Sequence, residues 1–306
     1  MRVLVTGARG KVGRAAVAAL QRAGHDTVAT DLGDPDFDTP PPGTAPYVKA
    51  DLTDAGQVYP LVGGASAGEG PRQGPFEAVV HAGALPAPGR HAPHIVFGNN
   101  LMATFNVVEA CVRWGVRRLV NVSSETVPGF IFAERPFLPA YLPLDEAHPV
   151  HPQDPYALAK VFGEQLCDAA VERSELRCIS IRPTWVQNAD TYHRNLGPFL
   201  VDRTRSSGTG WAYIDADDLA DAIRLAVESE LPGHEVVYIA ADDTIGGRDL
   251  HAAWKAAYPD ARTVLRPVSR PDASGIDTSK ARKLLGWRPS RSWRDHLTDD
   301  GAPLDR

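Results

Sequence analysis

Cysteine is scarce in this sequence, and its shortage excludes two classes of protein. The chain of 306 residues has three cysteines, Cys111, Cys167 and Cys178, too few for a disulfide framework or a cysteine-rich metal site. An odd number of scattered cysteines is typical of a reducing compartment, so we expect a cytoplasmic protein. The histidines follow no metal-ligand spacing and no H-E-x-x-H motif occurs, so the sequence predicts no metal site.

Positive charge and long apolar runs are also in short supply. Lysine and arginine number 32 against 38 aspartates and glutamates, a formal net charge of −6, which provides no general attraction for nucleic acid or an anionic membrane surface. The apolar stretch at residues 3–5 is too short for a signal peptide, and no later run is expected to approach a membrane span. We expect neither a nucleic-acid partner nor a membrane partner.

The composition is otherwise that of a folded chain. Apolar residues make up 43% and charged residues 23% of the sequence, the usual range for globular proteins. At about 100–200 residues per domain, the length allows one large domain or two interleaved domains with a sizeable core.

Short β-branched runs alternate with helical patterns along the first half of the chain. The apolar strand patterns occur at residues 3–6, 27–30, 78–81 and 118–123. The alternation predicts parallel β-α-β units, and hence an α/β fold built on a doubly wound parallel sheet. Two stretches rich in proline and glycine, residues 34–46 and 63–75, are predicted to be exposed loops.

The alternation loosens after residue 181, which predicts a second, smaller domain. Residues 182–215 and 242–306 carry most of the tryptophans among many prolines, and we expect them to form a C-terminal substrate-binding lid. Between them, residues 216–241 have the pattern of a helix and a strand that return to the main sheet. The first domain, residues 1–181, is thereby completed by this unit, and the two domains interleave.

Three glycines follow the first predicted strand directly and open a helix. Gly7, Gly10 and Gly13 form a G-x-x-G-x-x-G loop, in which residues without a Cβ let the backbone approach a pyrophosphate. The free N–H groups and positive end of the following helix stabilise phosphate charge. This context predicts a dinucleotide site on a Rossmann fold rather than an ordinary turn. The loop residues assigned to the cofactor are Gly7, Arg9, Gly10, Lys11, Val12 and Gly13, although Arg9 and Lys11 are equally open to simple solvation.

Two acidic residues downstream extend the predicted cofactor site. Asp31 ends the second strand, where its carboxylate can accept hydrogen bonds from the adenosine ribose hydroxyls. The same carboxylate repels a 2′-phosphate, which favours NAD over NADP; the alternative is an aspartate at a polar turn before Gly33. Asp51 and Leu52 are assigned a place beside the adenine, with a helix N-cap at Asp51 as an equal alternative.

Tyr156 and Lys160 stand one helical turn apart at the start of a long helical pattern. At i and i+4 they share one face, and a nearby ammonium and a positively charged nicotinamide both favour the phenolate of a tyrosine whose reference pKa is about 10. Ser123 and Ser124 lie at the carboxyl end of a central strand, where ligands bind in doubly wound sheets. These serines argue against an ordinary surface pair at Tyr156 and Lys160.

Together these motifs resemble those of a known family. The chain is similar, over nearly its whole length, to the extended short-chain dehydrogenase/reductases, which include the nucleotide-sugar epimerases and dehydratases. The resemblance rests on the sequences TGARGKVG, His81-Ala82-Gly83-Ala84, Asn99-Asn100, VSSETVPG, PYALAK, Arg182-Pro183 and DTSKARKLLGW.

The resemblance implies an NAD-dependent oxidoreductase and assigns roles to residues. Tyr156 is then the catalytic acid/base, Lys160 its partner that also holds the nicotinamide ribose, and Ser124 the catalytic serine. A homodimer is implied as well, built from helices near residues 104–114 and 157–173, unless Pro-rich loops cover their apolar surface. The rest of the cofactor-binding set is then His81, Ala82, Gly83, Asn100, Tyr156, Lys160 and Pro183.

Some positions depart from the family pattern and bear on the substrate. Glu125 and Thr126 follow the catalytic serine where dehydratases carry an Asp-Glu pair, which disfavours a 4,6-dehydratase. Trp211 and Tyr213 stand near the position at which the family usually carries a phosphate-binding arginine. Burying a diphosphate without cations costs on the order of several kcal/mol. We therefore expect a small sugar ring in the pocket, with Tyr213 adding an apolar face and Arg182 and Arg270 as alternative phosphate contacts. The residues assigned to the substrate are Ser124, Glu125, Trp185, Trp211 and Arg270.

Three functions are consistent with these residues. The leading one is a sugar epimerase, in which a hydride leaves a hydroxyl carbon for NAD and returns to the opposite face. The alternative is a net dehydrogenase of a free sugar, uronic acid or sugar-like alcohol. A non-catalytic NAD-sensing protein is the third, but such proteins usually lack a catalytic side chain, and here Ser124, Tyr156 and Lys160 are all present. The expected partner is a small carbohydrate.

Overall fold

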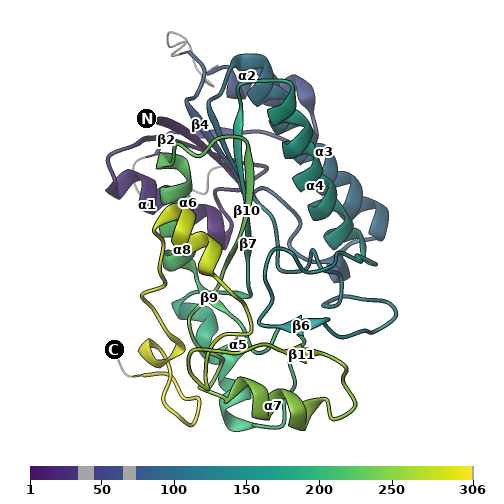
Figure 1. Ribbon diagram of the computed structural model, residues 1–306. Helices are drawn as coiled ribbons and strands as arrows, with labels where there is room; N and C mark the ends of the chain where they lie inside the picture. Colours follow the sequence, from purple (N-terminus) through teal and green to yellow (C-terminus); the bar gives the residue numbers. More distant parts are fainter. Residues whose placement is uncertain (34–44, 65–73, 305–306) are drawn as a thin grey trace.

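A parallel sheet forms the centre of the protein (Figure 1). The computed structural model describes residues 1–33, 45–64 and 74–304, so most of the two predicted loops at 34–46 and 63–75 lies outside the described residues. Within the described ranges the sheet has seven strands in the order β10-β7-β5-β4-β1-β2-β3, and neighbouring strands are parallel. They are β1 (Arg2–Thr6), β2 (Asp26–Asp31), β3 (Tyr47–Lys49), β4 (Ala78–His81), β5 (Arg118–Val122), β7 (Arg177–Pro183) and β10 (His234–Ile239).

Helices cover both faces of this sheet, which confirms the predicted doubly wound α/β fold. On one face α1 packs against α6, which also contacts α8, and on the other α3 packs against α2 and α4 (Figure 1). The helices are α1 (Lys11–Arg22), α2 (Ala55–Val62), α3 (Pro93–Trp114), α4 (Pro155–Glu172), α6 (Ala216–Glu228) and α8 (Ser279–Leu285).

The strands are continuously apolar because each one supplies side chains to two cores. Consecutive residues of a strand point to opposite faces of the sheet. In β1, Val3 and Val5 lie in the core that contains the buried residues of α1 and α6, whereas Leu4 lies in the core that contains those of α2 and α3. Covering both faces with helices thus removes the alternation of apolar and polar residues that a half-exposed strand would show.

Helix α3 is longer and more apolar than the sequence analysis expected. It begins at Pro93 rather than near residue 104, and it ends at Trp114. With 22 residues and a window of mean hydropathy 1.3 it is, by length and composition, able to cross a membrane, and half of that window is buried inside the protein. The expectation that no run approaches a membrane span is therefore wrong. An apolar helix is also what packing against α2, α4 and the sheet requires.

A smaller unit lies at the carboxyl ends of the strands, in the lower part of Figure 1. Its core is built from large side chains, and it includes Phe130, Leu142 and Leu144, which fall within the predicted first domain. Conversely, Trp287 falls within the predicted lid but lies in the main core with residues of α1 and α6. The elements of this unit are β6 (Tyr141–Leu142), β8 (Val186–Gln187), α5 (Ala189–Val201), β9 (Ile214–Asp215), α7 (Leu250–Ala257) and β11 (Val264–Leu265).

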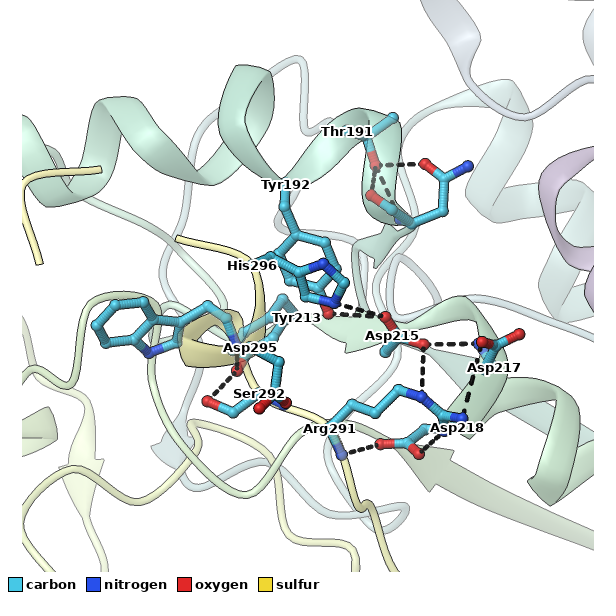
Figure 2. Close-up of polar contacts among 12 residues, drawn as sticks. Thr191, Tyr192, Tyr213, Asp215, Asp217, Asp218, Arg291, Ser292, Asp295 and His296 are labelled. Atoms are coloured by element: carbon cyan, nitrogen blue, oxygen red, sulfur yellow. Dashed lines mark hydrogen bonds and ion pairs between the residues drawn. The ribbon is translucent and has the colours of Figure 1, made fainter. Parts of the chain in front are cut away.

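A buried aspartate at the start of α6 ties a late segment of the chain to the main domain. Asp218 is 1% exposed and accepts four hydrogen bonds at 2.7–2.8 Å, from the backbone N–H and hydroxyl of Ser290 and from the backbone N–H and guanidinium of Arg291. We call these three residues the Asp218 clamp. Figure 2 shows the Arg291 side chain among the aspartates at the start of α6.

Candidate active site

The glycine-rich loop between β1 and α1 has the shape that a close backbone approach requires. Gly7 has a φ of +64°, and a Cβ there would lie 2.6 Å from the backbone of Ala82 and Gly83. A Cβ on Gly13 would lie 2.1 Å from the Gly7 carbonyl oxygen. No other residue fits at Gly7 without moving the end of β4, and none fits at Gly13 without opening the loop.

The start of α1 offers its N–H groups without a competing side chain. Gly10 is the N-cap and makes no side-chain cap hydrogen bond, so among the described residues no capping side chain competes with a phosphate for the first N–H groups at the positive end of the helix. The Lys11 ammonium instead donates to the Val186 carbonyl oxygen at 2.7 Å. Burial, followed by the charge of Arg194, lowers the pKa of Lys11. Lys11 thus joins the loop to the smaller unit in this structure.

Asp31 is held in a fixed orientation at the end of β2. Its two carboxylate oxygens accept the backbone N–H groups of Arg9, at 2.9 Å, and of Leu32, at 2.8 Å. The Arg9 guanidinium lies over Gly33, since a Cβ on that glycine would be 2.1 Å from Arg9 Nη1. A carboxylate and a guanidinium therefore border the same turn, where the adenosine ribose is expected.

The residues assigned to the adenine lie beside the glycine loop. A Cβ on Gly83 would be 2.5 Å from the Leu52 side chain, which places Leu52 against the backbone that contacts Gly7. Asp51 accepts the N–H and hydroxyl of Thr53 at 2.8 and 2.7 Å. The N-cap of α2 is Asp54, so the alternative role of Asp51 as an N-cap is wrong.

Two of the predicted site residues are committed to the protein interior. The ring nitrogens of His81 lie 2.9 Å from the Thr6 hydroxyl and 3.1 Å from that of Thr104. Burial, followed by the charge of Lys160, lowers the pKa of His81 to about 3, so its ring is neutral and serves packing. Asn100 exchanges two hydrogen bonds with the backbone of Leu85, at 2.8 and 3.0 Å, and so fixes the loop that follows β4.

Ser124, Tyr156 and Lys160 come together where β5 ends and α4 begins. Asp154 caps α4 by accepting the N–H groups of Tyr156 and Ala157 at 3.0 and 2.9 Å, which sets the helix start beside the strand end. The Lys160 ammonium donates to the Val122 carbonyl oxygen at 2.7 Å and lies 5.7 Å from the centre of the Tyr156 ring. The structure therefore groups the three residues that the sequence placed in one site.

Burial opposes charge on both members of the Tyr156 and Lys160 pair. It raises the pKa of Tyr156 to about 12, against a hydrogen bond with Ser124 that lowers this pKa. It lowers the pKa of Lys160 to about 8, against the charge of Glu164 that raises this pKa. Formation of the phenolate at neutral pH therefore requires further positive charge near the ring.

A buried ion pair close to Ser123 and Lys160 was not predicted. Glu164 accepts Ser123 Oγ at 2.6 Å and both Nε and Nη2 of Arg182, at 2.9 and 2.7 Å. The sequence signal was present, since Glu164 lies one turn beyond Lys160 on the face that begins at Tyr156. Arg182 enters from β7, a pairing that requires the sheet order and not only helix periodicity.

Glu125 follows Ser124 and lies close enough to Tyr156 for their charges to interact. Its backbone N–H donates to the carbonyl oxygen of Pro183, at the end of β7, at 3.1 Å. Its Oε2 is buried and has no hydrogen-bond partner among the described residues. Burial raises the pKa of Glu125 to about 8, and its charge in turn raises the pKa of Tyr156.

The predicted substrate residues do not form one surface. Trp185 is 40% exposed, with its ring edge-on to Phe199 at 6.3 Å between centroids. Trp211 and Tyr213 are fully buried in the core of the smaller unit, so the expectation that their rings contact a sugar is wrong. An aromatic residue near a pocket in the sequence can equally fill the core beneath it, which periodicity alone does not reveal.

Arg270 lies in a different pocket from Ser124, Tyr156 and Lys160. Its guanidinium pairs with Asp272 at 3.2 Å, in a surface pocket of about 400 Å³ whose lining includes none of Ser124, Tyr156 and Lys160. The pocket is lined by Asp242, Asp243, Arg270, Asp272, Pro289, Ser290, Arg291, Ser292 and Arg294. In the part of the chain that the structure describes, no group of three or more His, Cys, Asp or Glu residues is placed to hold a metal ion.

Comparison with known proteins gives the class of this protein. The NAD dependent epimerase/dehydratase family matches residues 3–240, and the chain therefore belongs to that family. It is an NAD-dependent oxidoreductase of this type, which confirms the predicted family, fold, enzymatic nature and cofactor. The glycine cradle, the open start of α1 and the oriented Asp31 carboxylate fit that cofactor.

Individual relatives are more distant. The chain is 27% identical to the uronate dehydrogenase of Pseudomonas putida, over 84% of this chain and 83% of that protein. It is 29% identical to the UDP-glucose 4-epimerase of Mycolicibacterium smegmatis, over 94% of each. A crystal structure of a UDP-galactose 4-epimerase superposes with a TM-score of 0.67 at 26% identity, covering 95% of this chain and 94% of that one.

Proposed function

We propose that this enzyme oxidises a hydroxyl-bearing carbon of a sugar or sugar-like ring that carries no nucleotide diphosphate. The uronate dehydrogenase and UDP-glucose 4-epimerase among its relatives support a carbohydrate substrate. The same active site serves a net dehydrogenase, which releases the oxidised sugar, or an epimerase, which reduces it again from the opposite face. The pairing of arginines described below favours the dehydrogenase of a free sugar.

The catalytic residues act on the proton and the oxygen of the substrate. NAD, when bound, supplies the hydride acceptor at its nicotinamide ring. Tyr156 removes the hydroxyl proton, and Ser124 donates a hydrogen bond to the oxygen as its charge changes. Lys160 provides positive charge close to the tyrosine. Gly7, Gly13 and the residues around them are proposed to hold the pyrophosphate, and Asp31 and Leu52 the adenosine. Ala82, Gly83 and Pro183 complete that set, and Asn100 supports it by fixing the loop after β4.

One observation carries the choice of a small substrate: Arg270, which the sequence offers as a phosphate contact, and the other arginines of its surface pocket are paired with aspartates. Arg270 lies 3.2 Å from Asp272, and Arg294 bonds to the buried Asp243. The third arginine of this pocket belongs to the Asp218 clamp. A diphosphate at this pocket would compete with carboxylates for each cation, and an unpaired buried phosphate costs on the order of several kcal/mol.

Product analysis tests this proposal directly. The purified enzyme is incubated with NAD and a panel of free sugars, uronic acids and nucleotide sugars, and the products are identified by mass spectrometry and NMR. We expect NADH and an oxidised sugar from a member of the free-sugar set. In parallel, calorimetry with UDP, dTDP and GDP on the NAD-loaded protein should show no binding at micromolar concentration; micromolar binding of any of them would overturn the proposal.

A nucleotide-sugar epimerase is the second candidate. The match to a UDP-glucose 4-epimerase over 94% of both chains favours it. In that case the product assay yields an epimer of a nucleotide sugar without net NADH. The two candidates thus give different products in one experiment.

A homodimer is proposed from the outer face of α3 and α4. This face exposes Ile95, Met102, Phe105 and Phe162 by 38–45% of their surface, and Phe97 packs edge-on against Phe162 at 6.0 Å. Adjacent exposed apolar side chains on two packed helices are typical of an isologous interface. Light scattering should give the dimer mass at micromolar concentration, and Phe162→Asp should give the monomer. A cytoplasmic location is proposed from the three buried free cysteines.

A further inference from the structure

Glu125 occupies an unusual position for a carboxyl group. It lies between the catalytic serine and Thr126, at the carboxyl end of β5, and its backbone is fixed by the hydrogen bond to Pro183. Its Oε2 is enclosed without a hydrogen-bond partner in the described part of the chain. Leaving a buried polar atom unpaired is costly, so such atoms in native proteins call for an explanation such as a ligand or a catalytic role.

We infer that Glu125 is a specificity-determining residue whose neutral carboxylic acid donates a hydrogen bond to a substrate oxygen other than the one that Tyr156 deprotonates. This inference rests on the proposed function, because the partner is an oxygen of the sugar ring or of its substituents. A neutral acid can donate to a hydroxyl, a carbonyl or a carboxylate oxygen. An ionised Glu125 can only accept, and it repels a carboxylate.

The groups around Glu125 favour the neutral acid. From α4 it faces the Tyr156 phenol and from β10 the Tyr238 phenol, and its charge raises the pKa of both. The cations nearest to these phenols are engaged elsewhere: the Lys160 ammonium bonds to the Val122 carbonyl oxygen, and Arg182 is held by both oxygens of Glu164.

Glu146 provides a comparison for the hydrogen bonding of Glu125. Glu146 is another carboxyl group whose pKa is raised by burial, but its Oε1 accepts the backbone N–H of Tyr238 at 2.7 Å. This oxygen of Glu146 is therefore partnered within the protein. The buried Oε2 of Glu125 has no such partner among the described residues.

The inferred role gives a particular dependence on pH and on substrate charge. Below about pH 8 Glu125 is neutral and admits both an aldose and the corresponding uronate. Above this pH it ionises, and its neutral fraction falls by about tenfold per pH unit. KM for the uronate should rise by the same factor. KM for the aldose should change much less, because no second negative charge meets Glu125. Lys160 also titrates near pH 8, so a variant must separate the two groups.

The experiment compares Glu125→Gln, Glu125→Ala and the control Glu146→Gln with the wild type, using a uronic acid and its aldose between pH 6 and 10. Glutamine keeps a donor and cannot ionise, so Glu125→Gln should retain KM at pH 7 and lose the rise for the uronate. Glu125→Ala should raise KM by roughly tenfold at pH 7, as expected for a lost hydrogen bond, and should also lack the alkaline rise for the uronate. Glu146→Gln should follow the wild type.

A second measurement is independent of turnover. The free energy of unfolding of Glu125→Gln and of the wild type is measured by urea denaturation across the same pH range, where the two should diverge as Glu125 ionises. Parallel stability curves, or turnover with identical pH profiles in the wild type and Glu125→Gln, overturn the inference and leave the proposed function intact. Failure of every sugar to turn over overturns the proposed function, and the substrate hydrogen bond with it.

Discussion

Two carboxyl groups in this enzyme, each with a buried oxygen, have opposite surroundings. Asp218 receives four hydrogen bonds from Ser290 and Arg291, whereas Glu125 has a buried oxygen without a partner in the described ranges and a pKa raised to about 8. A fully partnered charge holds segments of the fold together. An unpartnered one costs stability, and such groups persist mainly where function requires them.

The largest expected effect is on turnover, at Tyr156, close to Glu125. Tyr156→Phe keeps the buried ring in place and removes the proton that is exchanged with the substrate, so kcat should fall by about 10²–10⁴-fold. NAD affinity, measured by fluorescence titration, and the unfolding temperature should stay close to those of the wild type. Near-full turnover of a verified substrate by this variant would show that Tyr156 is not the acid/base.

The next largest effect is on the free energy of unfolding, through Asp218. Asp218→Asn removes the charge opposite Arg291, and breaking a buried pair costs about 3–5 kcal/mol of the free energy of unfolding. Because Arg291 is 36% exposed, we expect the lower end of this range, measured by urea denaturation at pH 7. Asp217→Asn is the matched control, since Asp217 is 51% exposed and lies 3.7 Å from the same arginine; it should cost less than about 1 kcal/mol. Equal losses of unfolding free energy in both variants would contradict a special role for the buried Asp218.

The stability of the protein should depend on pH with opposite signs through His81 and through Glu125. Burial lowers the pKa of His81 from 6.5 to about 3, so between these values only the unfolded state binds the proton, and stability decreases as pH falls. The pKa of Glu125 is raised from 4.5 to about 8, so in that window only the folded state holds the proton, and stability decreases as pH rises. Each slope is at most about 1.4 kcal/mol per pH unit.

Urea denaturation between pH 4 and 9 separates these two contributions. His81→Gln should flatten the loss of stability on the acid side relative to the wild type, and Glu125→Gln should flatten the loss on the alkaline side. The same flattening in both variants would contradict the assignment of the slopes.

The smallest expected effect concerns cofactor choice. The Asp31 carboxylate borders the place of the 2′-position, and a like charge about 4 Å away costs roughly 1–4 kcal/mol, so NAD should bind at least about fivefold more tightly than NADP. Asp31→Ala should reduce this preference, and Arg9→Ala should increase it, because Arg9 lies at the same turn. Equal dissociation constants for both cofactors in the wild type would refute the role of Asp31.

Local spacing predicted the parts of the site that depend on one strand and the helix after it. The glycine loop, the serine at the end of β5 and the Tyr156–Lys160 pair all follow from such spacing. The pairing of Glu164 with Arg182 and the burial of Trp211 depend on segments distant in sequence. The membership of Phe130 and Trp287 in the two cores had the same cause, since each packs against elements of the other predicted domain.

The Asp218 clamp also constrains how the nascent chain acquires its structure. Asp218 and Ser290 are separated by 72 positions, and Trp287 completes the core that holds residues of α1 and α6. At about 5–20 residues per second, the ribosome needs roughly 4–14 s to synthesise the intervening stretch. During that interval the apolar side of α6 and the sheet beneath it lack their last cover, and the nascent chain should be most prone to aggregation and to capture by chaperones.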